Sequence, residues 1–322
     1  MRGDSSSLQA WLAGAARGWP SAIAAGTADH GVCATAVIGC TAGDDFEIGS
    51  VAKAITGLLY ADSVTAGVLG PGTRLGELVD VGTGPVAEIA VSDLAVHRSG
   101  LPRLPAGINA ARRTWDLWRH GANPYGDSLA DLLVQASATG VGRRRFRYSN
   151  LGFELLGHAI ASAHGTRYGD LLRTRVTGPL GMERTYAPYE AQDLGPRALP
   201  GHSRRGRARD PWTGEAVAPA GGIRATVMDM TTLARALLDG TAPGVGALDP
   251  VERVAGPARI GAAWMTVPRN GSTLTWHNGR TGGFSAWIGL DRARGSGAVV
   301  LSATSRSVDR LGAALLDGIA AP

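Results

Sequence analysis

Apolar, partly β-branched runs mark both ends of the chain as strands. Residues 21–40 are small and apolar, as in Val32–Ile38, and predict a hairpin of two strands. Toward the C-terminus, residues 273–277 alternate in polarity, and residues 284–290 and 298–303 are two more strand-like runs. Their connections are short and rich in Gly and Asp, so we expect these three strands to form an antiparallel meander.

Between these ends, apolar residues recur at helical spacing. A buried helix is expected to start at Ser50, directly after Gly49. Further helices are expected at about residues 129–136, 151–163 and 227–238. A last helix carries an apolar face made of Val308, Leu311, Leu315, Leu316 and Ile319.

This arrangement predicts an α+β protein with two lobes. Strands from both ends of the chain build a sheet lobe from residues 1–65 and 216–322, and a helical lobe, residues 66–215, is inserted between them. We expect the active site in the cleft between the lobes, because small-molecule sites gather in such clefts.

Composition places the chain among ordinary folded proteins. Of its 322 residues, 44% are hydrophobic and 18% are charged, which argues against bulk disorder. No run approaches about 18 uninterrupted apolar residues, so the sequence excludes a transmembrane helix and we expect no membrane partner. Cys33 and Cys40 are too few for a disulfide scaffold or a four-thiolate zinc site, and we expect neither a metal nor a cofactor.

The N-terminal residues differ from a secretion signal. Asp4 and three serines stand where such a signal has basic residues, and the apolar run that follows is broken by Gln9 and ended by Arg17. We interpret this stretch as an amphipathic helix and expect a cytoplasmic protein.

Charge changes the picture at one position. The net charge is +5, and Lys53 is the only lysine beside 31 arginines. The arginine bias by itself is most simply a genome-composition effect. Arginine keeps its proton in a protein, whereas a buried lysine can lose it. Lys53 is therefore a candidate for a task that arginine cannot perform.

Ser50 lies three residues before this lysine, at the predicted helix start. Residues at positions i and i+3 of a helix share a face, so the Lys53 amine can reach the Ser50 hydroxyl. The helix N-terminus adds partial positive charge beside the serine. Taken alone the motif is weak, because a plain N-cap serine and a solvated lysine produce the same spacing.

Two further elements carry reactive side chains. Tyr148 precedes Ser149 and Asn150, either of which can cap the next helix, so the tyrosine is expected at a loop-to-helix junction that faces a cleft. His277 ends a strand that leads into a glycine-rich turn, where backbone N–H groups can approach a ligand. Each element has a structural explanation when it is taken alone.

Together and in this order, the motifs closely resemble a known superfamily. They are Ser50-x-x-Lys53, Tyr148-x-Asn150 and His277-x-Gly279. The resemblance is to the serine β-lactamase and penicillin-binding superfamily, in the branch of class C β-lactamases, D,D-peptidases and esterases. Residues 46–50, 94–102 and 219–223 also resemble that branch, and the similarity covers about residues 20–320.

The resemblance implies a fold and a set of roles. The fold is the β-lactamase/transpeptidase-like α/β sandwich, with a five-stranded antiparallel sheet flanked by helices. Ser50 would be the acylated nucleophile, and Lys53 and Tyr148 would carry its proton to the leaving group. Asn150 would position the substrate or Lys53. The backbone N–H groups of Ser50 and Arg280 would form the oxyanion hole.

Two positions depart from the family pattern. His277 stands where β-lactamases have a lysine that faces the carboxylate of the β-lactam, which points to esterases, D-amino-acid peptidases and acyltransferases. Arg280 stands where the branch usually has a small residue. Its side chain either points into the cleft and binds an anion, or lies on the surface of the lobe.

We therefore expect a serine hydrolase or acyltransferase that acts on a small ester or amide. The acyl group on Ser50 would pass to water in an esterase or amidase, or to an amine or alcohol acceptor in a biosynthetic transacylase. D-aminopeptidase, carboxypeptidase or weak β-lactamase activity is the alternative within this chemistry. A non-catalytic ligand-binding protein of the same fold is the alternative of another class.

Arginine runs at residues 143–147 and 204–209 permit nucleic-acid binding by charge alone. The runs are short and lie in loops, so we expect no nucleic-acid partner. We expect instead an anionic or strongly polar group on the substrate, close to Arg280 and to arginines 143–147. The sequence gives no oligomeric state.

Overall fold

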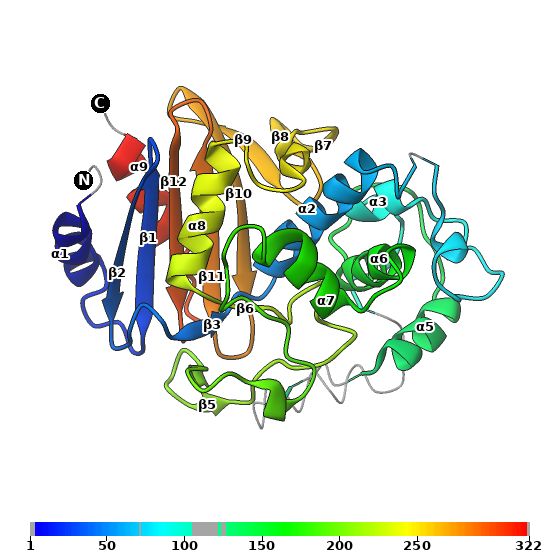
Figure 1. Cartoon of the computed structure of the whole chain (residues 1–322), viewed down its shortest axis with the longest axis horizontal. Coiled ribbons are helices and arrows are strands. Elements are labelled where there is room, and N and C mark those ends of the chain that lie inside the picture. The colour runs from blue at the N-terminus through cyan, green and yellow to red at the C-terminus, as the bar shows by residue number, and fades with distance from the viewer. Residues whose placement is uncertain (1–3, 71, 105–121, 124–126, 321–322) are drawn as a thin grey trace.

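A computed structural model describes residues 4–70, 72–104, 122–123 and 127–320 (Figure 1). Its helices are α1 Ser5–Ala15, α2 Val51–Thr65, α3 Val91–Ala95, α5 Leu129–Ser137, α6 Asn150–Ala163, α7 Tyr168–Leu172, α8 Val227–Leu238 and α9 Asp309–Ala320. Short helical turns lie at Leu75–Glu77, Arg173–Thr177, Ala191–Asp193 and Val245–Leu248. The predicted helices at 129–136, 151–163 and 227–238 are therefore confirmed to within a residue at each end.

The strands form one large sheet and two small pairs. They are β1 Ile23–Asp29, β2 Val32–Ile38, β3 Asp45–Glu47, β4 Gly201–His202, β5 Ala208–Arg209, β6 Arg224–Thr226, β7 Glu252–Ala255, β8 Ala258–Ile260, β9 Met265–Arg269, β10 Ser272–Arg280, β11 Ser285–Asp291 and β12 Ser296–Ser302. The large sheet has the order β2-β1-β12-β11-β10-β9-β8-β7, and all its neighbours are antiparallel.

The predicted hairpin and meander are confirmed, but the count of five strands is wrong. The five expected strands are adjacent in the order β2-β1-β12-β11-β10, and β9, β8 and β7 extend the sheet to eight within the described residues. The extra strands have three to five residues each, and most of their positions are exposed or half-buried. Short strands that pack little apolar surface leave a weak pattern in the sequence.

Helices cover both faces of the sheet. Helices α1 and α9 pack on one face, and α8 packs on the other, against β1 and β12 (Figure 1). Strand residues alternate between the two cores as the pleat requires. Ala24 and Val299 join the core under α8, and Ala25 and Val300 join the core under α1 and α9.

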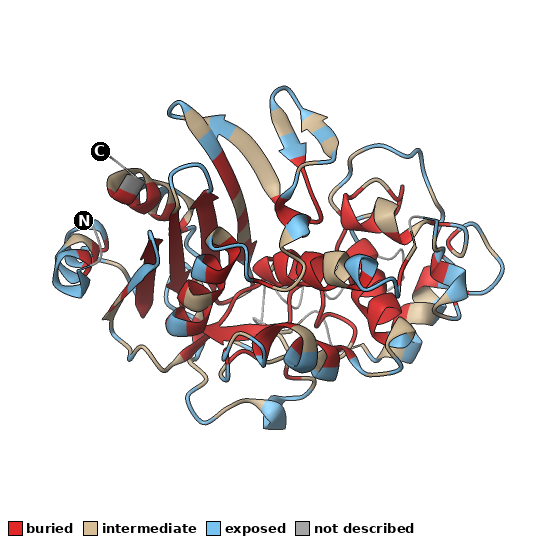
Figure 2. Cartoon of the chain, turned by 45° about the horizontal axis from the view of Figure 1, so that its top comes forward, coloured by how far each residue is buried: buried red, intermediate tan, exposed pale blue. Residues whose placement is uncertain are grey.

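Helix α2 connects the sheet with the other helices. It contacts strand β10 on one side and helix α6 on the other, and it is buried along most of its length (Figure 2). Because α2 packs both on the sheet and on the other helices, it does not mark a border between two lobes. The lobe boundaries at residues 65/66 and 215/216 therefore stay a prediction.

A small two-stranded sheet leads the chain into α2. Strands β3 and β6 pair directly before residue 48, and the backbone N–H of Ile48 donates to the carbonyl of Ile223 at 3.1 Å. Between the strands, the buried Arg224 forms ion pairs with Asp45 and Glu47. A buried ion pair with its hydrogen bonds in place is rigid, so this pair fixes the chain just before residue 50.

Candidate active site

Ser50 lies at the start of α2 with its hydroxyl available for chemistry. Its backbone is αR (φ −63°, ψ −6°), and its side chain makes no capping hydrogen bond to the helix. The plain N-cap explanation is therefore wrong for this serine. Instead, the Ser50 hydroxyl accepts a hydrogen bond from Lys53 Nζ at 3.2 Å.

Lys53 is held in place by a second acceptor. Its side chain is fully buried, and Nζ also donates to the backbone carbonyl of Ala220 at 2.5 Å. Ala220 belongs to the segment that leads into β6, the strand paired with the approach to Ser50. One local structure thus positions both the serine and the acceptor that orients the lysine. The solvated-lysine explanation is wrong as well.

Burial tunes this amine toward neutrality. It lowers the pKa of Lys53 to about 7, against the opposing effect of the Glu154 carboxyl, and the guanidinium of Arg103 lowers it further. Glu154 lies on α6, and burial raises its own pKa to about 8. A lysine with such a pKa can give and take a proton near neutral pH, which an arginine cannot do.

Tyr148 is the third side chain of the candidate site and lies close to both Ser50 and Lys53. It lies directly before α6, at the loop-to-helix junction that the sequence predicted, and Ser149 caps the helix by accepting from the N–H of Gly152 at 2.9 Å. Lys53 Nζ lies 5.1 Å from the centroid of the Tyr148 ring. Burial raises the pKa of Tyr148 to about 12, and its hydrogen bond with Ser50 opposes that rise. Near neutral pH the tyrosine is therefore a protonated hydroxyl.

Strand β10 approaches the serine very closely at Gly279. A Cβ on Gly279 would lie 1.9 Å from the carbonyl oxygen of Ile48 and 2.8 Å from the Ser50 nitrogen, so glycine alone fits there. Gly49 has φ +51°, and a Cβ on it would lie 2.7 Å from the Arg280 nitrogen. The backbone segments that carry Ser50 and Arg280 therefore pack closely against each other. The oxyanion hole expected from their N–H groups stays a prediction.

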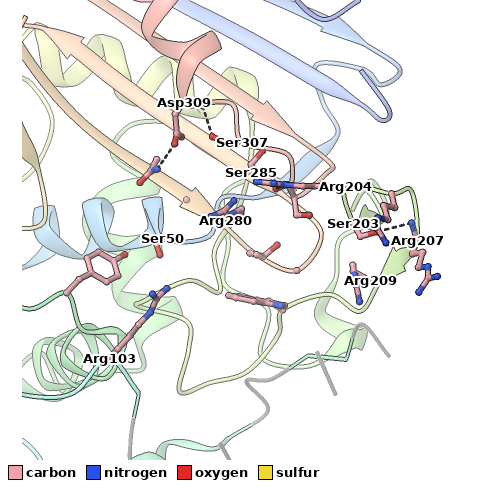
Figure 3. Close-up of a pocket in the computed structure, with 18 residues that line it drawn as sticks. Ser50, Arg103, Ser203, Arg204, Arg207, Arg209, Arg280, Ser285, Ser307 and Asp309 are labelled. Carbon is pink, nitrogen blue, oxygen red and sulfur yellow. Dashed lines mark hydrogen bonds between the residues drawn. The ribbon is translucent and has the colours of Figure 1, made fainter. Parts of the chain in front are cut away.

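The cleft itself holds about 940 Å³. Of the predicted site residues, Ser50, Tyr148, Gly279 and Arg280 line it. Lys53, Asn150 and His277 are buried and are absent from its lining residues. The Arg280 side chain is exposed and lines the cleft opposite Arg103 (Figure 3).

His277 is buried near Lys53. Burial, and to a smaller extent the charge of Lys53, lower the pKa of His277 to about 4. Its Nδ1–H donates to the carbonyl of Asn278 at 2.7 Å, because a carbonyl oxygen can only accept. The ring is therefore neutral near pH 7. Asn150 sits in the first turn of α6, where its N–H donates to the carbonyl of Arg103 at 3.0 Å.

Only one part of the expected set of arginines lines the cleft, namely Arg280. Arginines 143–147 are exposed but do not line the cleft, and Arg144 forms an ion pair with Asp93. The second arginine run supplies the charge instead. The cleft arginines are Arg103, Arg204, Arg205, Arg207, Arg209 and Arg280. Closeness in sequence to Tyr148 was a poor guide, because Tyr148 lines the cleft and the arginines just before it do not.

His97 is a positioning residue that the sequence did not single out. Its carbonyl accepts from Arg147 N at 2.8 Å, its Nδ1 accepts from Ser149 N at 3.2 Å, and its ring lies 4.5 Å from the Tyr148 ring. His97 thus holds Tyr148 from three directions. Its backbone has φ +57°, a strained value for this residue type. The only sign of His97 in the sequence was that it belongs to residues 94–102, a segment that resembles the family branch.

We expect a His97→Leu substitution to lower kcat about 10-fold or more with a small change in KM, because Tyr148 would lose its support. The variant His97→Asn offers a side-chain oxygen in place of the Nδ1 acceptor and tolerates the positive φ, so it should recover most of the rate. Both variants should be checked for fold by thermal unfolding. Equal kcat values for wild type and His97→Leu would show that His97 serves packing alone.

No three His, Cys, Asp or Glu side chains gather as metal ligands would in the described part of the chain. His158 lies near Glu154 on α6. Its Nε2 is hydrogen-bonded to the backbone carbonyl of Glu215 at 3.0 Å. In the same residues, no helix has the length and apolarity that crossing a bilayer demands.

Solved structures show the fold that this chain adopts. A class C β-lactamase superposes with a TM-score of 0.82 at 17% identity, over 98% of this chain and 96% of that one. The D-alanine carboxypeptidase AmpC from Burkholderia cenocepacia superposes with a TM-score of 0.75 at 20% identity, over 93% of each chain. The β-lactamase/transpeptidase-like fold is confirmed.

Curated relatives are similar over parts of their length. The unguisins hydrolase of Aspergillus campestris is 28% identical over 251 residues, which cover 71% of this chain and 45% of that protein. The D-alanyl-D-alanine-carboxypeptidase/endopeptidase AmpH of Escherichia coli is 37% identical over 105 residues, 32% of this chain and 26% of that protein. The match thus spans less than half the length of these relatives.

A family model described as Beta-lactamase matches residues 10–321, nearly the whole chain. Together with the fold, this match shows that the protein belongs to the β-lactamase family.

Proposed function

We propose that this protein transfers acyl groups through an ester formed on Ser50. The observation that carries the proposal is the contact of 3.2 Å between Ser50 Oγ and Lys53 Nζ, in which the lysine is fully buried and its pKa is lowered to about 7. A neutral amine at hydrogen-bond distance is a general base for the hydroxyl.

In the first half-reaction, Ser50 Oγ attacks the carbonyl carbon of an ester or amide, and its proton passes to Lys53. The negative charge on the carbonyl oxygen is stabilised by the N–H groups of Ser50 and Arg280. The bond to the leaving group then breaks, and the leaving group takes a proton from Lys53 by way of the Tyr148 hydroxyl. The product of this half-reaction is an acyl ester on Ser50.

In the second half-reaction, water or an amine or alcohol attacks the same carbonyl carbon, and the bond from that carbon to Ser50 Oγ breaks. The proton that the attacking group loses passes through Tyr148 and Lys53 to Ser50 Oγ, which restores the free serine. Water makes the protein an esterase- or amidase-type hydrolase, and another acceptor makes it a transacylase. The Aspergillus and Escherichia relatives are named as a hydrolase and a carboxypeptidase/endopeptidase, which favours hydrolysis. A D-aminopeptidase or carboxypeptidase uses the same two half-reactions.

Product analysis tests this proposal and separates its branches. The protein is incubated with a 4-nitrophenyl ester in the presence and absence of candidate amines, and the products are followed by mass. Free acid alone indicates a hydrolase, and an amide that grows with amine concentration indicates a transacylase. Stoichiometric ligand binding without any turnover of esters or amides would instead identify a non-catalytic binding protein.

We expect β-lactam hydrolysis to be weak or absent. His277 is neutral near pH 7, because burial and the Lys53 charge lower its pKa to about 4. A neutral, buried imidazole is a poor partner for the carboxylate of a β-lactam. Nitrocefin turnover measures this directly, and rates typical of resistance enzymes would contradict the expectation.

We expect Arg280 to bind an anionic group close to the scissile bond. Its side chain lines the cleft next to Ser50 and forms no ion pair with the described residues. Arg280→Ala should raise KM for an anionic ester far more than for its neutral analogue, and the difference should shrink in high salt. Equal effects on both esters would leave Arg280 with a backbone role alone.

A further inference from the structure

The cleft holds more arginine than chance provides. Six of its eighteen lining residues are arginine, whereas arginine is about a tenth of the whole chain. Among those lining residues, Asp309 is the only acidic one. A cleft lined by one sign of charge concentrates ligands of the opposite sign.

These arginines fall into two groups. Arg103 and Arg280 lie beside Ser50, and the others belong to the β4–β5 hairpin and the turn inside it (Figure 3). We call this second group the arginine wall: Arg204, Arg205, Arg207 and Arg209. Figure 3 shows Arg207 and Arg209 on the side of the cleft away from Ser50.

The hairpin is docked firmly on the sheet lobe. The N–H of His202 donates to the carbonyls of Gly283 and Ala303 at 3.0 and 3.2 Å, and within the hairpin Ser203 N donates to Arg207 O at 2.8 Å. Gly283 lies in the turn between β10 and β11, directly after Arg280. The arginine wall is thus fixed relative to the strand that borders Ser50.

Three of the four wall arginines form no ion pair with the carboxylates that the structure describes. Arginines elsewhere in the described chain form ion pairs, for example Arg98, Arg167, Arg175 and Arg269. Arg204, Arg205 and Arg207 form none with the residues that the structure describes. Within the described residues, the charge of these three side chains is therefore open to counter-ions or to an anionic ligand.

The size and charge of the cleft point to one class of ligand. About 940 Å³ is near the upper end of ligand pockets and exceeds the needs of a small simple ester. A phosphate group carries up to two charges and accepts paired hydrogen bonds from guanidinium groups, so several close arginines suit it better than a single carboxylate.

We propose that the acyl substrate carries a phosphate-bearing portion that binds the arginine wall while its carbonyl carbon lies at Ser50. This inference rests on the proposed acyl transfer, because it assigns the wall to the same substrate. A nucleic-acid strand presents phosphates too, but the arginines line a bounded cleft that contains Ser50, which favours a small molecule.

The kinetic test compares three 4-nitrophenyl esters whose acyl chains have one length and end in a methyl group, a carboxylate or a phosphate. The double variant R204Q/R207Q removes two wall charges. Its control, R253Q/R259Q, removes two exposed arginines that pair across the β7–β8 hairpin, away from the cleft. We expect R204Q/R207Q to lower the ratio of kcat/KM for the phosphate ester to that for the methyl ester roughly 10-fold. R253Q/R259Q should keep the wild-type ratio.

A binding test works without catalysis. Calorimetry measures inorganic tripolyphosphate binding to Ser50→Ala, alone and combined with each double variant. We expect binding that R204Q/R207Q weakens roughly 10-fold, that R253Q/R259Q leaves unchanged, and that high salt weakens. Absence of tripolyphosphate binding, or equal loss in both double variants, would overturn the inference.

The two tests distinguish a failure of the proposed acyl transfer from a failure of the inference about phosphate. If no ester turns over, the proposed acyl transfer fails, and tripolyphosphate binding still decides whether the wall binds phosphate. If esters turn over and the ratio of phosphate to methyl ester is the same in wild type and R204Q/R207Q, acyl transfer stands and the inference fails. Random duplex DNA that binds more tightly than tripolyphosphate through the wall would also overturn it.

Discussion

Replacement of Ser50 by alanine is expected to abolish acyl transfer and leave the fold intact. Removal of a serine nucleophile costs about 10⁴-fold or more in kcat in enzymes of this mechanistic type. Ser50 makes no capping hydrogen bond to α2, so its loss removes no structural contact of the helix. The contacts that disappear are the hydrogen bonds of the Ser50 hydroxyl with Lys53 Nζ and with Tyr148.

Turnover of a chromogenic ester by wild type and Ser50→Ala, measured at equal concentrations, checks this expectation. Thermal unfolding serves as the control, and the two melting temperatures should agree within a few degrees because a buried core is untouched. Turnover by the alanine variant within a few-fold of wild type would rule out Ser50 as the nucleophile.

The second large effect is expected for Lys53→Arg. Arginine keeps the positive charge but cannot give up its proton, so the rate should fall ~10²-fold or more, the scale of a general base. Arginine is also larger than lysine, and Lys53 is fully buried, so Lys53→Met is needed as a companion variant of similar length without charge. Both variants should be inactive while Lys53→Met remains folded.

The pH profile separates proton transfer from simple charge. In the wild-type protein, burial lowers the pKa of Lys53 to about 7, so the neutral amine predominates only above that pH. Because the base must be neutral, kcat/KM should rise with pH through about 7 and then level off. A Lys53→Arg protein with near wild-type activity would reduce Lys53 to an electrostatic role.

The central architecture could be predicted because it follows local periodicity. Apolar residues recur at helical spacing in the run behind Gly49, and this run becomes helix α2, which is buried along most of its length. The alternating and β-branched runs become β1, β2, β10, β11 and β12. Strands β3 and β6 have three residues each, and their pairing depends on contacts between segments about 180 residues apart, which local periodicity cannot show.

The reacting residues were also visible in the sequence, for a different reason. Ser50 and Lys53 share a helix face whatever the tertiary structure is, and a lysine that stands alone among arginines marks a special environment. Tyr148 came from the order of the motifs, and the structure places it next to both residues.

The surroundings of these residues could not be predicted, because they depend on how distant loops meet. The carbonyl that orients Lys53 comes from Ala220, and the support for Tyr148 comes from His97. Four of the six arginines that line the cleft come from the β4–β5 hairpin, whereas the arginine run nearest to Tyr148 in sequence is exposed and does not line the cleft. Tertiary packing decides which of two similar runs lines a site.

The measurement that tests the central claim most directly is the intact mass of the protein after treatment with a fluorophosphonate, followed by peptide mapping. A serine activated by Lys53 and Tyr148 should gain one phosphonyl group, on Ser50, and Ser50→Ala should gain none. An unmodified wild-type protein under conditions that label other serine hydrolases, or an adduct that maps to a residue other than Ser50, would contradict the account.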